Sequence, residues 1–194
     1  IRFVPLNTST GGAFSIDNIS VKEVTSYSGG GFERDAYKLV EDTSGNSHDI
    51  YKLLGNPIGV GATYTYSIYA KAGERSKLGF RENSQTGYYG AVDLSGGTVL
   101  DTSSTSVNMT ELSGGWWRVS FTAVSGGNGN IGCKLYLLSD SYSSGDPAHS
   151  NQEYTGDGTS GLYIAYAQME ESDYASSLML PTTEGSTTSR VADA

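Results

Sequence analysis

The sequence predicts an all-β fold, and two observations carry that prediction. The chain of 194 residues contains 26 glycines and 14 tyrosines but only 4 prolines, and serine and threonine are also abundant. Thr and Tyr suit half-buried strands, and glycine suits the turns between them. No window of a dozen residues shows an apolar stripe with the 3.6-residue period of a helix. A chain of this length can bury a core of its own.

Short segments with period-two alternation follow one another along the chain. The predicted strands span residues 14–24, 36–41, 48–54, 62–72, 77–83, 89–94, 98–101, 107–112, 116–124, 131–139 and 161–170. The turns between them are rich in Ser, Gly and Asn, at residues 28–31, 43–46, 84–87, 95–97, 113–115 and 125–129. Many short strands closely spaced by turns are typical of a β-sandwich, and a jelly roll is the form that we expect.

The first predicted strand echoes the last one. Residues 12–23 and 161–171 both open with glycine, alternate with period two and end in acidic residues. We therefore expect residues 1–24 to be the closing strand of an upstream β-module or an added N-terminal strand. Residues 25–180 then form the jelly-roll sandwich, with a long polar loop at 140–160. Residues 181–194 lack an apolar pattern and are predicted to be a C-terminal arm or linker.

Alternation assigns the side chains of each strand to one of two faces. The faces predicted to be buried carry Trp117, Val119, Phe121, Ala123, Tyr64, Tyr66, Ile68, Ala70, Leu78 and Phe80. The lone cysteine, Cys133, alternates with Ile131, Leu135 and Leu137 and is interpreted as a small buried hydrophobe. The opposite faces are predicted to form one polar sheet face that carries Trp116, Arg118, Tyr69, Lys71, Arg81, Lys134 and Tyr136.

The net charge of the chain and its lack of known catalytic motifs limit the partners and activities that we expect. The formal net charge of −9 repels phosphate backbones, and no Lys/Arg cluster favours anionic lipid, so neither nucleic acid nor a membrane is expected as a partner. No apolar run approaches the roughly 20 residues that span a bilayer. His48 and His149 lack further ligands at metal spacing, and Glu170 and Glu171 point to opposite faces of a strand. We therefore expect no enzymatic activity.

Several motifs occur in a recognisable order, at residues 37–42, 63–72, 115–120, 154–164, 167–170, 174–183 and 188–193. Over residues 30–194 this order resembles the concanavalin-like jelly-roll domains of bacteriophage virion proteins such as head spikes and tail fibres, which look like carbohydrate-binding modules. Separately, residues 14–23 are similar to the closing strand of carbohydrate-binding modules that end in an Ile-Asp-Asn-hydrophobic pattern. The resemblance implies a virion-surface or extracellular location, with other virion subunits or adjacent β-modules as partners.

The polar sheet face is the candidate glycan site, because sugar rings stack on aromatic rings while guanidinium groups bond the hydroxyls. The predicted glycan-contacting residues are Trp116, Arg118, Tyr69, Arg81, Tyr136 and Tyr88. The alternative is that Trp116 packs beneath a loop or a neighbouring module. Tyr88 and Tyr89, which follow a turn, leave the same two alternatives open.

Calcium is the second candidate ligand, since hard oxygen donors suit that ion. Asp157 and Asp140 are the predicted metal ligands, with Asp146 and Glu153 in the same long loop and Asp17 in the first strand. Their spacing matches no EF-hand, and the Asp157 segment is also compatible with a simple turn.

The sequence therefore predicts a non-catalytic domain of a phage head spike or fibre that contacts a glycan or host-surface polysaccharide. One alternative is a carbohydrate-binding module of a secreted bacterial enzyme that degrades polysaccharides. Another is a purely structural capsid decoration domain. The N-terminal strand could pair with the sheet edge of a second copy, so a homo-oligomer is a further candidate assembly.

Overall fold

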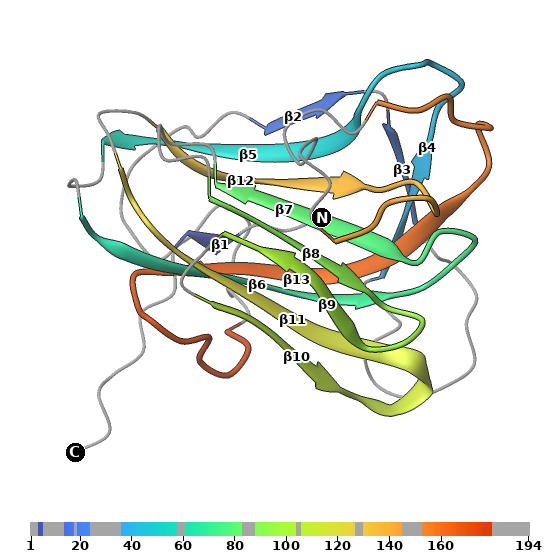
Figure 1. Ribbon diagram of the computed structural model, residues 1–194. Coiled ribbons are helices and arrows are strands. Elements are labelled where there is room, and N and C mark those ends of the chain that lie inside the picture. Colours follow the sequence, from blue (N-terminus) through green and yellow to red (C-terminus); the bar gives the residue numbers. More distant parts are fainter. Residues whose placement is uncertain are drawn as a thin grey trace.

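The structure, a computed structural model, describes residues 4–5, 14–17, 19–23, 36–57, 61–82, 88–103, 106–126, 130–144 and 153–179. These residues form β-strands and one short 3-10 turn, without an α-helix. The strands build two sheets that face one another as in a sandwich (Figure 1). The predicted all-β sandwich class is confirmed.

The two sheets contain seven and six strands within the described ranges. The seven-stranded sheet runs in the order β10 (Ser106–Glu111), β11 (Trp116–Val124), β6 (Thr63–Lys71), β13 (Gly161–Glu170), β4 (Tyr37–Glu41) and β3 (Ile19–Glu23), with β1 (Val4–Pro5) parallel to β13. The six-stranded sheet runs in the order β2 (Phe14–Asp17), β5 (His48–Pro57), β12 (Asn130–Leu137), β7 (Lys77–Glu82), β8 (Tyr89–Asp93) and β9 (Thr98–Thr102).

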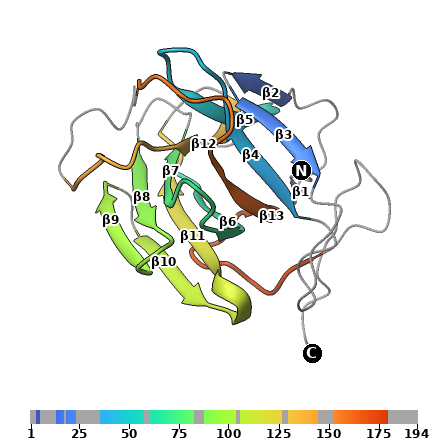
Figure 2. The same cartoon turned by 90° about the vertical axis from the view of Figure 1, so that its right-hand side faces the viewer.

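Pairing from β4 onward is nested. The first strand of this segment, β4, pairs with the last, β13; the second, β5, pairs with β12; and the third, β6, pairs with β11. All three pairs are antiparallel. The middle of the segment closes one side of the sandwich, where β9 lies beside β10 (Figure 2). Strands β2 and β3 lie on the other side.

The predicted strand at 14–24 is wrong in one respect, because the chain there forms two strands in different sheets. Strand β2 pairs with β5, and β3 pairs with β4. The apolar positions are Phe14 and Ile16 in the first strand and Ile19 and Val21 in the second, so the phase of the alternation shifts by one residue where the chain crosses from one sheet to the other. The other predicted strands are found within a few residues of their expected bounds.

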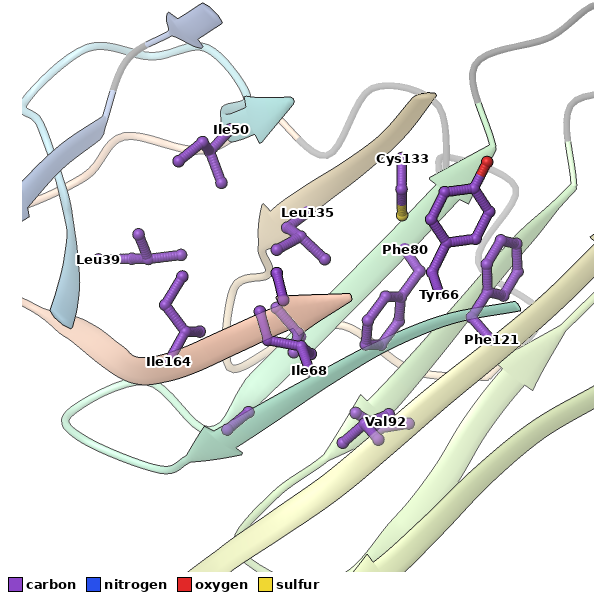
Figure 3. Close-up of a cluster of buried hydrophobic side chains, with 14 of the residues drawn as sticks. Leu39, Ile50, Tyr66, Ile68, Phe80, Val92, Phe121, Cys133, Leu135 and Ile164 are labelled. Carbon is purple, nitrogen blue, oxygen red and sulfur yellow. The ribbon is translucent and has the colours of Figure 1, made fainter. Parts of the chain in front are cut away.

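The core lies between the two sheets, as predicted from the alternation (Figure 3). It contains Leu39, Tyr64, Tyr66, Ile68, Ala70, Val119, Phe121, Ala123 and Ile164 from one sheet and Ile50, Leu78, Phe80, Val92, Cys133, Leu135 and Leu137 from the other. The rings of Phe80 and Phe121 stack across the core with centroids 6.0 Å apart. Burial raises the pKa of the Cys133 thiol, in keeping with its predicted role as a small hydrophobe.

Trp117, also predicted for the core, is partly buried against it at the side of the sandwich. Its Nε1 donates a hydrogen bond to the Leu94 carbonyl at 2.9 Å, which ties β11 to the turn between β8 and β9. Gly97 in that turn has φ of 62°, and a Cβ there would run into the Trp117 ring. Glycine is therefore required at this position by both backbone and packing.

A β-bulge in β13 changes which side chains face outward. The register of β13 on β6 shifts between Ala165 and Gln168, and Tyr166 has φ of 48°, an uncommon conformation for a bulky residue. As a result, Ala165 and Tyr166 both join a cluster on the outer face, while Ala167 returns to the core.

Candidate functional site

The structure divides the predicted polar face between two opposite surfaces of the sandwich. Trp116, Arg118, Tyr69 and Lys71 belong to β11 and β6 in the seven-stranded sheet, whereas Arg81, Lys134 and Tyr136 belong to β7 and β12 in the six-stranded sheet. The prediction of one shared face is therefore wrong. Alternation assigns a side chain to the inside or the outside of its strand, but it does not say which sheet the strand joins.

The outer face of the seven-stranded sheet is covered. Trp116 is 3% exposed and Tyr69 is 7% exposed, and both pack with Ala36 and Ala165. Partly buried side chains surround this cluster, namely Leu112, Tyr163, Tyr166 and Leu178. The expected exposure of Trp116 and Tyr69 is thus wrong, and the packing alternative describes them. We call this surface the covered face.

Residues 171–179 form the cover, and we call them the C-terminal strap (red in Figure 2). The strap is tied to β13 by buried polar side chains. Both the backbone N–H and the hydroxyl of Ser176 donate to the Glu170 carboxylate, and the N–H of Met179 donates to Gln168 Oε1 at 2.9 Å. Because Glu170 and Gln168 are themselves buried, these bonds hold the strap against the sheet.

Arg118 also binds the strap. Its guanidinium donates to the Ser176 carbonyl and lies over the Tyr69 ring, 5.8 Å from the centroid. Among the described side chains, Trp116 Nε1 and Arg118 Nε are buried without a hydrogen-bond partner. The strap therefore buries apolar surface here at a cost in unpaired polar atoms.

The outer face of the six-stranded sheet carries four half-buried side chains in one cross-strand row. Lys134 on β12 lies opposite Tyr51 on β5, and on its other side opposite Arg81 on β7. Arg81 in turn lies opposite Tyr89 on β8. We call these four residues the tyrosine–cation row, and each of them remains partly exposed.

Lys134 is held in place from three sides. Its Nζ lies 3.2 Å from Asp49 Oδ2, and the rings of Tyr51 and Tyr136 lie 4.9 and 5.7 Å from it. Asp49 is only 1% exposed, whereas a quarter of the Lys134 side chain reaches solvent. An ammonium group has three N–H donors, so a fixed Lys134 can still donate outward.

Tyr136, a predicted glycan contact, lies beneath a loop. It is 3% exposed and packs with Ala91, Leu138 and Tyr142. The ammonium of Lys77 holds this loop by donating to the carbonyls of Asp140 and Tyr142 at 2.6 and 2.7 Å. Burial raises the pKa of Tyr136, with Arg81 and Lys134 acting in the opposite direction. Tyr136 therefore lies beside the row on the same outer face, two residues along β12 from Lys134.

Tyr88 and Tyr89 point to different sides of the six-stranded sheet. Tyr88 packs against the main core, whereas Tyr89 belongs to the outer row. Of the two alternatives left open for Tyr88, packing is the one that its contacts favour, and its neighbour Tyr89 lies on the outer face.

A buried polar cluster fixes one end of the sandwich. The Glu41 carboxylate is 1% exposed and accepts hydrogen bonds from Arg75 Nε and Nη2, the Tyr154 hydroxyl and the Asp157 N–H, at 2.7–2.9 Å. His48 is fully buried, and its Nε2 lies 3.1 Å from the Tyr154 carbonyl. We call these residues the Glu41 cluster. Burial alone would raise the pKa of Glu41, but the bonds from Arg75, Tyr154 and Asp157 lower it. The Glu41 carboxylate therefore has a structural role, since it links Arg75, Tyr154 and Asp157 through hydrogen bonds.

The two predicted calcium ligands have internal partners. Both Asp157 oxygens accept hydrogen bonds from Thr159 and Ser160, which lowers the pKa of Asp157, and Asp140 forms an ion pair with Arg75 at 2.7 Å. The backbone of Glu153 forms an isolated antiparallel β-bridge with Ser47, and Asp146 lies outside the described residues. Within the described ranges, no three His, Cys, Asp or Glu side chains gather where they could hold one metal ion.

In the part of the chain that the structure describes, no helix is long and apolar enough to cross a bilayer. The chain was also compared with protein-family models and with curated proteins. The chain matches no protein-family model and no curated protein.

Sequence reasoning placed Lys134 and Arg81 outward and noted Tyr89, but it did not single out Tyr51. The available signal was the alternation of Asp49 and Tyr51 within the predicted strand at 48–54. The strand order β5-β12-β7-β8 is needed to see that these side chains form a row.

Proposed function

We propose that the chain is a non-catalytic domain of a bacteriophage virion appendage, such as a head spike or fibre, and that it contacts glycans. The order of the motifs at residues 37–42, 63–72 and 115–120 supports the virion setting through its resemblance to virion jelly-roll domains. The nested pairing of β4 with β13, β5 with β12 and β6 with β11 supports the jelly roll, because such a fold is a long hairpin rolled into two sheets.

The tyrosine–cation row is the single observation that carries the glycan-contacting role. Two tyrosine rings at its ends, Tyr51 and Tyr89, offer faces on which sugar C–H groups can stack. Lys134 and Arg81 between them offer N–H donors for ring hydroxyls and carboxylates. The row holds neither a nucleophile paired with a base nor two facing carboxylates, which fits binding without catalysis.

Glycan-array binding of the purified chain tests this role, run with calcium and again with a chelator. We expect binding that is about tenfold weaker in Tyr89→Ala and unchanged in Tyr174→Ala, since Tyr174 is 66% exposed on the strap. Binding of wild-type strength by a folded Tyr89→Ala protein would show that the row is not the glycan site. A blank array from folded protein would contradict the glycan-contacting role.

A structural decoration domain is the second candidate, and the covered face favours it. There the aromatic side chains, including Trp116, serve packing. Under this candidate the array stays blank, and the chain assembles with a virion subunit through a sheet edge such as β3. Glycan binding by a monomer would instead favour a module of a secreted polysaccharide-degrading enzyme.

A further inference from the structure

We propose that the tyrosine–cation row binds an extended glycan as a single chain, which crosses the strands and places one sugar on each of four strands. This inference rests on the glycan-contacting role and names the shape and length of the ligand for the same row. The row contains Tyr51, Lys134, Arg81 and Tyr89, and each lies directly opposite the next on the adjacent strands β5, β12, β7 and β8. The row therefore runs perpendicular to the strands.

The spacing of the row matches that of a sugar chain. Neighbouring strands lie about 4.7–4.9 Å apart, so the backbones of Tyr51 and Tyr89, separated by three strand spacings, lie roughly 14–15 Å apart. One pyranose unit in a chain with β-1,4 linkages is about as long as one strand spacing. Four sugars of such an extended chain therefore reach from one tyrosine to the other.

The ends and the middle of the row contact the chain in different ways. The tyrosine rings at the ends offer their faces to the first and fourth sugars. The two central cations are held by internal partners. Lys134 pairs with Asp49 at 3.2 Å, and Arg81 forms a hydrogen bond with the Tyr136 hydroxyl. These cations therefore do not require an anionic ligand. An ammonium has three N–H donors and a guanidinium has five, so each can also donate to a hydroxyl of a central sugar.

The twist of the sheet limits the ligand to a single chain. Adjacent strands are rotated by about 20–25° on average, so the surface turns by roughly 60–75° between Tyr51 and Tyr89. A single chain follows such a turn by small rotations about its glycosidic bonds, whereas a flat crystalline polysaccharide cannot contact both ends of the row. A coiled chain such as amylose does not fit either, because its curvature carries the fourth sugar away from the row.

Titration calorimetry on chains of two to six sugars tests the inference. Cello-oligosaccharides and β-1,4-manno-oligosaccharides are the extended series, and malto-oligosaccharides of the same formula are the coiled series. In at least one extended series, we expect the affinity to rise about tenfold or more from disaccharide to tetrasaccharide and to change by less than about twofold beyond it. Maltotetraose should bind about tenfold more weakly than that tetrasaccharide. Neutral chains are used because the net charge of −9 repels polyanions.

Variants of Tyr51 test the contact with the terminal sugar. Tyr51→Ala should make the tetrasaccharide bind only as tightly as the trisaccharide, because one end of the row has lost its ring. Tyr51→Phe should keep the gain, since the ring face remains. If Tyr51→Ala does not fold, Tyr51→Leu takes its place, because leucine keeps an apolar side chain without a ring. Thermal melting of each variant shows whether it is folded.

A tyrosine on the covered face provides the matched control. Tyr163 is partly buried, and the Nζ of Lys38 lies 5.9 Å from its ring centroid. Tyr51 is likewise partly buried, with the Nζ of Lys134 at 4.9 Å. Tyr163→Ala should leave the dependence of affinity on chain length unchanged, because this ring lies on the opposite face of the sandwich.

The outcomes separate this inference from the role on which it rests. Equal affinity for disaccharide and tetrasaccharide would overturn the extended-chain inference and leave glycan contact standing. Maltotetraose that binds as tightly as the extended tetrasaccharide, or an unchanged length dependence in folded Tyr51→Ala, would overturn it as well. So would retention on microcrystalline cellulose without binding of the soluble chains. If neither extended series binds but the array gives a hit, the inference alone is overturned. A blank array as well overturns both.

Discussion

The two outer faces of the sandwich carry similar residues and use them differently. On the covered face, Trp116 and Tyr69 are buried beneath the C-terminal strap. On the opposite face, Tyr51 and Tyr89 flank Lys134 and Arg81 in a row that stays partly exposed. Aromatic and cationic side chains on the outside of a strand therefore do not by themselves mark a binding surface. What covers them decides whether they pack or bind.

Replacing Trp116 should give the largest effect and should act on folding. We expect Trp116→Ala to lower the free energy of unfolding by about 3–5 kcal/mol, because it leaves a cavity beneath the strap. Urea denaturation measures the loss, with Tyr174→Ala on the exposed part of the strap as the control. A Trp116→Ala protein as stable as the wild type would contradict the burial of this face.

The Glu41 cluster should have an effect of similar size without involving either face. We expect Glu41→Gln to destabilise the protein by about 3–5 kcal/mol, because it leaves the Arg75 charge without its buried partner. Asp140→Asn removes the exposed partner of the same arginine and should cost no more than about 1 kcal/mol. Equal losses in the two variants would mean that burial does not distinguish these carboxylates.

The pH dependence of stability follows from the same carboxylate. The folded-state pKa of Glu41 is lowered from 4.5, so its contribution is fully present above that value and is lost as the pH falls through the lowered pKa. We expect the melting temperature to fall on acidification below 4.5, and to fall less in Glu41→Gln. Binding assays near neutral pH are then free of this effect. A wild type and variant with the same acid profile would contradict the assignment.

The adjacent residues Tyr88 and Tyr89 allow core packing and glycan contact to be tested separately. Tyr88→Ala should cost about 1–3 kcal/mol of stability, because Tyr88 packs against the core. Tyr89→Ala should change stability by less and should weaken glycan binding about tenfold, or about 1.4 kcal/mol. Denaturation and calorimetry on both variants measure the two effects. A larger loss of stability in Tyr89→Ala and weaker glycan binding in Tyr88→Ala would contradict the assignment of Tyr88 to the core and Tyr89 to the outer face.

The smallest effect is expected at the strap. Ser176→Ala removes the hydroxyl that donates to Glu170 and should cost about 1 kcal/mol while leaving glycan affinity unchanged. Denaturation and array binding measure both. If loosening the strap instead strengthened binding, the covered face would be a second glycan surface, and the contrast between the faces would fail.

Sequence reasoning found most strands, because alternation and turn residues are local signals. It also found the core, since Val119, Phe121, Ile68 and Leu135 lie on the inner faces of their strands. It missed the step between Asp17 and Ile19, where the chain changes sheets and the alternation of apolar residues shifts by one position.

The candidate site was harder to predict, because it depends on contacts between distant segments. Nothing local to Trp116 shows that the strap, some 60 residues later, packs over it, although Leu178 and Met179 are apolar residues in a polar stretch. Likewise, Lys134 and Arg81 become neighbours only through the pairing of β12 with β7.

Mapping a bound glycan onto the sheet by NMR tests the central contrast most directly. Backbone amide shifts of the labelled chain are followed while the strongest glycan from the array is added. We predict that the largest shifts fall at Tyr51, Lys134, Arg81 and Tyr89, with little change along residues 171–179. Shifts centred on Trp116 and the strap would show that the covered face is the binding surface and would contradict the account.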